Sequence, residues 1–530
     1  MEKIINWVKQ VWFTKLKKNK VEFAILIAIL AVGAFLRLYR IADYMTFLGD
    51  EGRDAIVVRR LLVYFDPILI GPGTSIGNMY LGPLYYYLIA PSLLLARFSP
   101  VGPSVFVALV GVATVFLVWK IGREWFGRIA GIIAAFFYAI SPTVIIFSRS
   151  SWNPNVMPFF ALLCIYSVWK IYQSREALRS ESGSKTLREV GWWFIILGIS
   201  FAFCLQSHYL GLLLLPTLGI YWFITFLRIK KDSTKENKKS FLRYSLFSVL
   251  LFLFLMSPLV IFDARHGWRN FEAMKNFFSV RQETVSIKPW NAIPKVFPIF
   301  EKVNIRLLAG RNDFAGKTIS FAFVVFLLWL LFNSKKLTIN HQPLTIILVW
   351  LGFALLGLGL YKKEIYDHYY GFFFPAPFIL IGGIFQFIFE KKRTKLLLYF
   401  AIFCLASVNL WNTPVRYPPN FQLQRSEHIA KFIEEKSAGE RFNIATISER
   451  NNRDVYQYFL TLWGAQVVDT DPSAVEYTVT NQLFVVCEKP KEKCDPVHDP
   501  SAWITNFGWT KIVDQWEVSG VNIYKLGHAK

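Results

Sequence analysis

The chain has 530 residues, of which 54% are hydrophobic, 17% aromatic and 18% charged, and its 59 Lys and Arg residues against 36 Asp and Glu residues give a net charge of +23. A soluble protein usually carries about 25% charged residues, so this composition argues against an ordinary soluble enzyme. It also argues against a nucleic-acid-binding protein, which has no need of apolar stretches such as residues 321–332. The remaining class is a membrane protein with several spans, whose positive charge marks one side of the bilayer.

A membrane span requires roughly 20 mostly apolar residues to cross about 30 Å of hydrocarbon. Eleven segments are candidates: 21–41, 103–119, 129–147, 157–172, 191–207, 209–227, 244–262, 318–332, 344–360, 371–389 and 396–410. Lys and Arg cluster at alternate ends of these segments, near residues 15–20, 120–128, 175–188, 228–243, 335–336 and 391–395. Because positively charged loops stay in the cytoplasm, the pattern predicts about eleven crossings, a cytoplasmic N-terminus and a C-terminus outside. We expect a multi-pass protein of the plasma (inner) membrane.

The first apolar segment is too long for the core of a signal peptide and is followed by no small-residue cleavage pattern, so it is expected to remain as an uncleaved span. The acidic side chains Asp50, Glu51 and Asp54 follow it directly. Beyond them the chain has an amphipathic pattern, which predicts a helix lying in the membrane interface. In the simplest interpretation Asp50 only caps this helix, and Arg59 and Arg60 bind anionic headgroups.

The apolar segment 80–98 does not fit the charge-derived topology. Pro83 and Pro91 interrupt it, and a full crossing there would move every later basic cluster to the outside. We therefore expect a re-entrant or membrane-lying pair of short helices, which is tolerated where protein or a cavity covers the backbone. If this segment does span, one of the weaker candidates must not.

From residue 413 the composition becomes polar, with prolines that mark a linker. We predict a helix that opens at Ser426 and stops at Gly439, a strand at 442–448, a helix at 454–463, a strand at 482–487 and a hairpin at 510–526. The fold class is therefore mainly α, with a small C-terminal α/β domain outside the cytoplasm. This domain has no phosphate loop or nucleotide fingerprint.

Two of the five cysteines, Cys487 and Cys494, bracket a polar loop of the C-terminal domain, where a disulfide is chemically permitted. We favour that disulfide over two free thiols. Cys164, Cys204 and Cys404 lie in apolar spans and are most simply core residues.

A long first span, an Asp-Glu pair at the head of the first outside loop and an interfacial helix resemble the GT-C glycosyltransferases that use polyprenyl-phosphate sugars. Within that superfamily the chain is similar to the dolichyl-phosphate-mannose protein mannosyltransferase and aminoarabinose transferase group. The motifs that carry the resemblance all fall on the outside: Gly49-Asp50-Glu51, Gly82-Pro83-Leu84-Tyr85, Ser148-Arg149 with Trp152-Asn153-Pro154-Asn155, His208-Tyr209, Asp263-Ala264-Arg265-His266-Gly267, and Asp367-His368-Tyr369-Tyr370 before Pro375 and Pro377. The resemblance implies a GT-C catalytic domain at 1–412 and an extracytoplasmic domain at 413–530.

In this family the Asp of the pair is implied to be the general base, and that role transfers to Asp50, with Glu51 beside it. Attack by an acceptor hydroxyl on the anomeric carbon would release a lipid phosphate, which needs cations and polar partners rather than an acid. Candidates for binding the phosphate or substrate are Arg53, Arg149, Asn153, His208, Asp263, Arg265, His266 and His368, with Lys362 and Lys363 as further cations. Each also has an ordinary interpretation, such as a solvated loop lysine or a polar residue at a span end. A single displacement would invert the sugar carbon.

Two departures from the family pattern affect these expectations. Where related enzymes often carry a second acidic residue, this chain has Asn153 and Asn155, and an amide cannot act as a base; Asp263 could substitute if its loop folds back. The Lys or His that the family often places beside the proline of segment 80–98 is missing, so the phosphate must be bound differently.

We expect no cofactor and no metal, because the histidines are scattered and an Asp-Glu pair alone cannot form a cage. The predicted partners are the bilayer, a polyprenyl-phosphate sugar donor and a lipid, glycan or protein acceptor, without nucleic acid. A transporter or lipid flippase is the alternative, although it should place charged residues at mid-span and show repeated halves. A non-catalytic scaffold is a third possibility.

Overall fold

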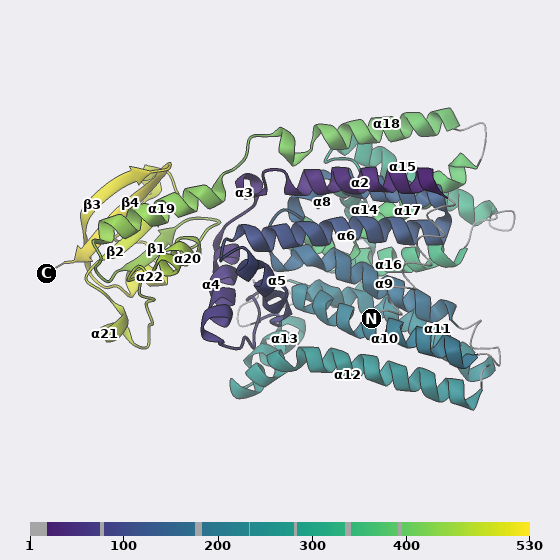
Figure 1. Cartoon of the computed structure of the whole chain (residues 1–530), viewed down its shortest axis with the longest axis horizontal. Coiled ribbons are helices and arrows are strands. Elements are labelled where there is room, and N and C mark those ends of the chain that lie inside the picture. Colours follow the sequence, from purple (N-terminus) through teal and green to yellow (C-terminus); the bar gives the residue numbers. More distant parts are fainter. Residues whose placement is uncertain are drawn as a thin grey trace.

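The computed structural model describes residues 19–74, 79–174, 183–232, 234–279, 284–333, 341–390 and 395–529. A bundle of long, roughly parallel helices carries a small α/β domain at one end (Figure 1). The bundle helices are α2 (Lys20–Leu38), α6 (Val101–Phe126), α7 (Arg128–Ile140), α9 (Met157–Gln173), α10 (Gly183–Ser207), α11 (Leu215–Asp232), α12 (Lys235–Arg265), α15 (Asp313–Asn333), α16 (His341–Gly359), α17 (Pro375–Phe389) and α18 (Lys395–Trp411).

Each of the eleven predicted spans overlaps one of these helices, although not every helix is long enough to cross a membrane, and the predicted fold class is confirmed. Within the described residues, eight helices are long and apolar enough to cross a membrane, or nine if η6 (Asp367–Phe373) and α17, which meet at a bend of 61°, form one span. Helix α7 has only 13 residues and is followed, after a break at Ser141, by α8 (Pro142–Phe147).

Segment 80–98 forms one helix, α5 (Leu84–Leu95), rather than the expected pair of short helices. Pro83 stands at its N-cap, where a missing N–H costs nothing, and Pro91 lies inside the helix without ending it. At 12 residues, α5 is too short to cross a bilayer, in agreement with the expectation that this segment does not span.

Several short helices that the apolar pattern did not predict connect the spans. They are α3 (Ile41–Tyr44), η1 (Asn153–Val156), η3 (Tyr209–Leu214), α13 (Arg269–Ser279), η4 (Pro289–Ala292) and α14 (Ile293–Leu307). Helix α14 is strongly amphipathic, as expected of a helix at the edge of a bundle.

The C-terminal domain contains η8 (Pro414–Arg416), α19 (Gln422–Ser437), β1 (Asn443–Ile447), α20 (Asp454–Trp463), α21 (Val475–Thr478), β2 (Leu483–Cys487), η9 (Lys491–Lys493), α22 (Ala502–Thr505), β3 (Thr510–Val518) and β4 (Val521–His528). The sheet order is β1-β2-β4-β3, with β1 parallel to β2 and the other pairs antiparallel. Helix α19 begins at Gln422, four residues before the predicted start, and the Asn420 side chain accepts the Gln422 N–H at 3.0 Å. The predicted Cys487–Cys494 disulfide is present.

Helix α4 (Gly49–Tyr64) lies across the end of the bundle, between the bundle and the C-terminal domain (Figure 1). Apolar side chains from both sides form one core here, in which the ring of Phe47 meets those of Tyr458 and Phe459 at 6.4 and 5.7 Å. The Phe47 N–H also donates to the Gln422 side chain at 3.1 Å. The C-terminal domain is thus packed directly onto the segment that carries Asp50.

Candidate active site

The acidic motif forms the first turn of α4. Glu51 folds back so that its Oε2 accepts the Leu48 N–H at 3.0 Å, which satisfies one of the backbone donors exposed at a helix N-terminus. Burial raises the pKa of Glu51 to about 8. Glu51 is therefore protonated at neutral pH and occupied as a cap, and it is not suited to accept a proton from a substrate.

Asp50 has a different environment, because its side chain is 48% exposed and opens into two cavities. The two cavities share Asp50 and Trp152 in their walls. A group bound in either cavity can therefore approach the same carboxylate.

The larger cavity has a volume of about 540 Å³ and a mostly apolar wall built from the bundle. Its lining residues are Asp50, Arg53, Pro72, Gly73, Thr74, Met79, Leu81, Trp152, Asn153, Pro154, His208, Tyr209, Leu210, Leu212, Leu213, Met274, Phe277, Val285, Gly357, Leu358, Leu360, Tyr361, Tyr366, His368 and Tyr369. Such a cavity, largely apolar with a few convergent polar groups, is typical of a site for a ligand with an apolar body.

Two histidines of this wall, His208 and His368, lie among aromatic rings. The His368 ring lies 4.7 Å from Trp152, 4.6 Å from Tyr369 and 6.0 Å from His208, between ring centroids. His208 Nδ1 accepts the Leu210 N–H at 3.1 Å, which leaves Nε2–H as the donor of a neutral ring. Burial, and secondarily the neighbouring His368, lowers the pKa of His208 to about 3, so His208 is neutral in the empty cavity.

The smaller cavity, of about 380 Å³, lies between α4, the segment that follows α8, and the C-terminal domain. Its lining residues are Thr46, Leu48, Gly49, Asp50, Glu51, Ile146, Phe147, Ser150, Trp152, Asn155, Arg450, Asn451 and Asn452. Three of these belong to the C-terminal domain, so that domain contributes directly to the surroundings of Asp50.

Arg53 was predicted as a phosphate ligand, but its three nitrogens all donate to carboxylates. Nη1 donates to Asp50 Oδ1 at 2.7 Å, whereas Nε and Nη2 donate to Asp54 Oδ1 at 3.1 and 2.7 Å. Asp54 is buried, and this burial raises its pKa to about 6 in spite of the nearby Arg53. The arrangement links Asp50 to an anchor inside the protein.

The structure brings Arg53, Asn153, His208 and His368 to the wall of the larger cavity, but not Arg149, Asp263, Arg265 or His266. Asn153 lines that cavity and donates to the Ser207 carbonyl at 2.7 Å. Arg149 is buried, and its guanidinium donates to the carbonyls of Leu36 and Tyr39 at 2.6 Å each, so it ties the end of α2 to the bundle.

The loop that follows α12 does not fold back over Asp50. Asp263 instead accepts the N–H groups of Asn270 and Phe271 at 2.7 and 2.9 Å and so caps α13. Arg265 and His266 are exposed and lie outside both cavity walls, as do Lys362 and Lys363.

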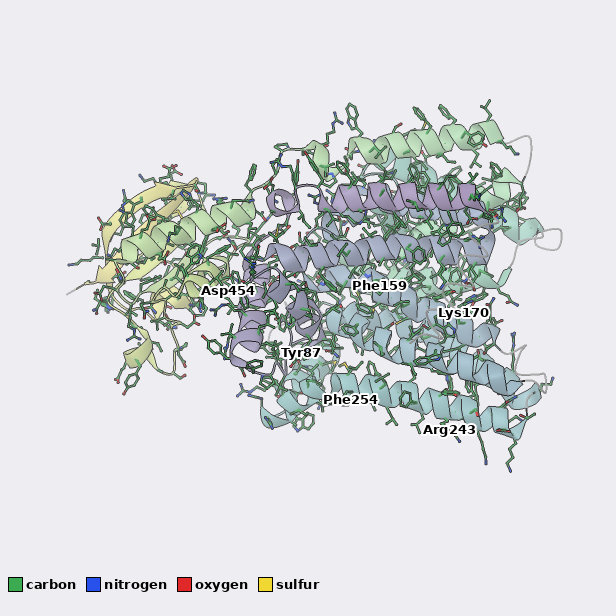
Figure 2. The ribbon with its side chains drawn as sticks, viewed as in Figure 1. Tyr87, Phe159, Lys170, Arg243, Phe254 and Asp454 are labelled. Carbon is green, nitrogen blue, oxygen red and sulfur yellow. A yellow bond between two sulfur atoms is a disulfide. The ribbon has the colours of Figure 1, made fainter. Side chains whose placement is uncertain are left out.

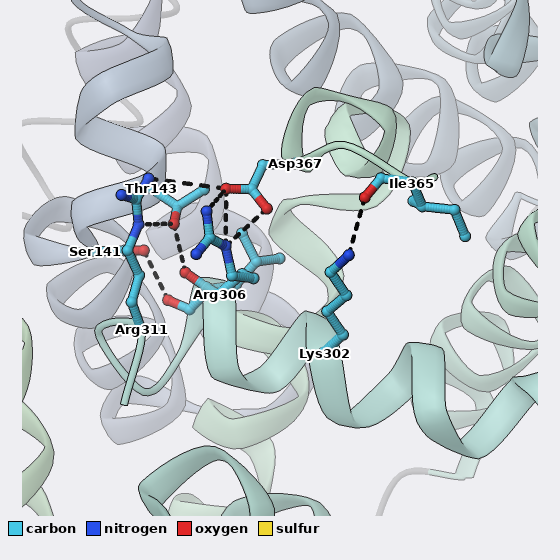
Figure 3. A network of polar contacts seen from close by, with 8 residues as sticks. Ser141, Thr143, Lys302, Arg306, Arg311, Ile365 and Asp367 are labelled. Carbon is cyan, nitrogen blue, oxygen red and sulfur yellow. Dashed lines mark hydrogen bonds and ion pairs between the residues drawn. The ribbon is translucent and has the colours of Figure 1, made fainter. Parts of the chain in front are cut away.

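A network that the sequence did not indicate holds the segment carrying His368. Arg306 donates to both oxygens of Asp367, and Arg311 lies 3.8 Å from the same carboxylate. The Lys302 ammonium donates to the Ile365 carbonyl at 3.1 Å (Figure 3). These contacts fix both flanks of a segment whose Tyr366, His368 and Tyr369 line the larger cavity. The amphipathic pattern of residues 293–307 could have indicated the helix that carries Lys302 and Arg306, but it does not indicate which residues these side chains contact.

Among the residues that the structure describes, no group of three or more His, Cys, Asp or Glu side chains could hold a metal ion.

Known proteins resemble this chain in sequence over part of its length and in fold over most of it. Residues 81–262 match the model of the family described as dolichyl-phosphate-mannose-protein mannosyltransferase. No curated protein sequence matches the chain closely enough to count as a relative. The solved structures described below resemble the chain in fold but are distant from it in sequence.

ArnT from Cupriavidus metallidurans bound to undecaprenyl phosphate is 12% identical, with a TM-score of 0.56, and covers 95% of this chain and 97% of its own. The apo form of the same enzyme gives 13% and 0.57 over the same shares. The oligosaccharyltransferase AglB from Archaeoglobus fulgidus, in complex with an inhibitory peptide and a dolichol-phosphate, is 13% identical with a TM-score of 0.53, and covers 90% of this chain and 70% of its own. The chain therefore shares the fold of these structures over most of its length.

Proposed function

We propose that this protein is an integral-membrane glycosyltransferase that transfers a sugar from a polyprenyl-phosphate donor to an acceptor hydroxyl, with Asp50 as the general base. The observation that carries the proposal is that Asp50 lines both cavities, so that a donor on one side and an acceptor on the other meet at one carboxylate. The second acid of the motif, Glu51, is less suited to act as the base, because it is buried and its carboxyl group accepts the Leu48 N–H.

In the proposed reaction the acceptor oxygen forms a bond to the anomeric carbon while the bond from that carbon to the phosphate oxygen breaks. The electron pair of the broken bond leaves on the phosphate, and the acceptor proton passes to Asp50. A positioned base of this kind typically accelerates a reaction by about 10²–10⁴-fold. Because there is one displacement, the product has the inverted configuration.

The larger cavity suits the donor, since its apolar wall can take the start of a polyprenyl chain and its rings can face the sugar. His208 and His368 are the groups we assign to the phosphate. The Nε2–H of His208 can donate to a phosphate oxygen, and protonation of either ring would be favoured by the charge that develops on the leaving group.

The comparisons support a lipid-phosphate donor. The ArnT structure holds undecaprenyl phosphate, the AglB structure holds a dolichol-phosphate, and the family that matches residues 81–262 is described by its dolichyl-phosphate-mannose donor. These are properties of those proteins, and for this chain they favour glycosyl transfer over the transporter alternative.

The charge distribution supports an active site on the outer face. Lys170 and Arg243 lie toward the end of the bundle away from the C-terminal domain, whereas Asp454 lies where that domain faces the bundle (Figure 2). With the basic end in the cytoplasm, both cavities and the C-terminal domain are outside.

The test uses the full chain in lipid nanodiscs with a panel of labelled undecaprenyl-phosphate sugars and an acceptor extract from membranes. The expected result is release of undecaprenyl phosphate and transfer of the label to a new product of inverted configuration. Movement of intact donor between leaflets of a proteoliposome, without cleavage, would overturn the proposal in favour of a flippase.

A further inference from the structure

We propose that the smaller cavity binds the acceptor and that this acceptor is a neutral, hydroxyl-rich glycan recognised partly by the C-terminal domain. The inference rests on the proposed function, because it takes Asp50 as the base that receives the acceptor proton. It goes further by choosing one acceptor class among lipid, glycan and protein.

The position of the cavity suits an acceptor. The larger, apolar cavity takes the donor, and the smaller cavity reaches Asp50 from the other side of Trp152, which stands in both walls. A hydroxyl bound there would have its proton next to the Asp50 carboxylate and its oxygen directed toward the donor sugar, as a single displacement requires.

Besides Asp50, Glu51 and Arg450, the wall of the smaller cavity offers hydroxyl and amide groups. Thr46, Ser150, Asn155, Asn451 and Asn452 all line it. Asn155 donates through Nδ2 to the Ser150 carbonyl at 2.8 Å, while its buried Oδ1 has no partner among the described residues. An unpaired buried acceptor is costly unless a ligand or a water molecule becomes its partner.

The two asparagines of the C-terminal domain are held in place before any ligand binds. Asn451 donates to Glu488 at 2.7 Å, and the Tyr456 hydroxyl contacts the same carboxylate at 2.5 Å. The Asn452 Oδ1 accepts the Asp454 N–H at 2.9 Å, which leaves the Nδ2 group to donate. A rigid pair of amides recognises hydroxyl groups at a low entropic cost.

Charge and shape disfavour the other acceptor classes. An anionic lipid headgroup would have to approach the Asp50 carboxylate, and Arg450, which is exposed, is the one cation among the described lining residues. A peptide is usually bound by strand pairing or as a helix in a long groove, but none of the described lining residues lies in a strand. Trp152 and Phe147, which also line this cavity, are aromatic residues on which a sugar can stack.

The experiment separates binding from chemistry. The full chain carrying Asp50→Asn, in nanodiscs, is tested for binding of three probes: neutral hexose oligosaccharides, a Ser/Thr-containing peptide, and phosphatidylglycerol added to the nanodisc. The same measurement is made with Asn452→Asp added. Asp retains the oxygen that accepts the Asp454 N–H but replaces the Nδ2 donor by a negative oxygen. The matched control is Asn481→Asp, an exposed asparagine of the same domain outside the cavity.

We expect an oligosaccharide of the panel to bind, Asn452→Asp to weaken that binding at least about tenfold, which corresponds to 1.4 kcal/mol, and Asn481→Asp to leave it unchanged. Binding of the peptide or the anionic lipid, with no binding of any oligosaccharide, overturns the inference. An oligosaccharide affinity that Asn452→Asp leaves unchanged also overturns it. Failure of the proposed function is distinguishable, because donor cleavage is measured separately with the unsubstituted chain: donor cleavage with a non-glycan acceptor contradicts only the inference.

Discussion

Arg53 Nη1 donates a 2.7 Å hydrogen bond to Asp50 Oδ1, one helical turn away along α4. The other two nitrogens of the same guanidinium bind the buried Asp54, whose side chain is 1% exposed. The orientation of the proposed base is therefore set by a contact whose far end is fixed inside the protein, although Asp50 itself is open to both cavities. Arg53 is in this sense a positioning residue.

Replacing Arg53→Lys should lower kcat about 10- to 100-fold, the loss expected when a catalytic group is misplaced by about an ångström. Lysine keeps the charge but cannot bridge two carboxylates with a planar fork. Steady-state kinetics at varied donor concentration measure the effect, and KM for the donor should change much less than kcat. The control is Arg60→Lys on the same helix, where the exposed pair with Asp66 should matter little. Equal kcat values for the two variants would contradict the positioning role.

The substitution Glu51→Gln should leave most of the activity, because Glu51 already acts in its protonated form and glutamine can still accept the Leu48 N–H. Burial raises the pKa of Glu51 to about 8. The pKa of Glu51 in the unfolded chain is about 4.3, below its value in the folded protein. Between these two values the free energy of unfolding falls as pH rises, by up to about 1.4 kcal/mol per pH unit.

The thermal unfolding midpoint of the unsubstituted chain should therefore fall relative to that of Glu51→Gln between pH 5 and pH 8. Midpoints that run parallel across this range would show that Glu51 is not the buried acid described.

Two glycines allow the C-terminal domain to approach α4. A Cβ added at Gly52 would lie 2.6 Å from the Val455 nitrogen and 2.7 Å from the Asp454 carbonyl carbon, and one at Gly49 would lie 2.3 Å from the Asn452 side chain. Because the first contact is with backbone, Gly52→Ala must displace the domain. We expect lower activity and a lower thermal midpoint for Gly52→Ala.

Gly219→Ala is the matched control, since Gly219 also lies in a helix but has nothing within 4 Å of the added carbon. Alanine there should be neutral or stabilising by up to about 1 kcal/mol. If both variants behave alike, close packing at Gly52 does not matter.

Asp367→Asn should raise KM for the donor, because Arg306 and Arg311 would lose the carboxylate that anchors the segment before His368 and Tyr369. An increase of about tenfold corresponds to 1.4 kcal/mol. Asp66→Asn, which removes only an exposed pair with Arg60, should have no such effect. Donor titrations of the two variants decide the point, and an unchanged KM in Asp367→Asn would mean that the network serves stability alone.

The parts of the fold that follow from apolar pattern could be predicted from the sequence. Long apolar runs predict helices directly, and the alternating strands and the hairpin of the C-terminal domain were recognised for the same reason. Helix α14 was missed, because short amphipathic helices between spans give a weak signal. The start of α19 was misplaced, because the helix begins after Phe421, which is not a typical N-cap residue, and not at Ser426.

The site could be predicted from the sequence only where a chemically reactive side chain lies next to the end of a predicted span. Asp50 stood out beside the first span, and His208 and His368 were recognised near span ends. The contribution of Asn451 and Asn452 could not be foreseen, because tertiary packing brings them to Asp50 from the other domain. Conversely, Arg149 and Asp263 looked functional but satisfy backbone groups of neighbouring helices.

The most direct test of the account is the rate of sugar transfer from an undecaprenyl-phosphate donor by the Asp50→Asn chain, reconstituted at the same level as the unsubstituted protein. The amide keeps the shape of the side chain and can still accept from Arg53, but it cannot take a proton. We predict that the rate of sugar transfer falls at least about 100-fold, the lower range for loss of a general base, while donor binding is retained. Transfer at the rate of the unsubstituted protein would contradict the role of Asp50 as the general base.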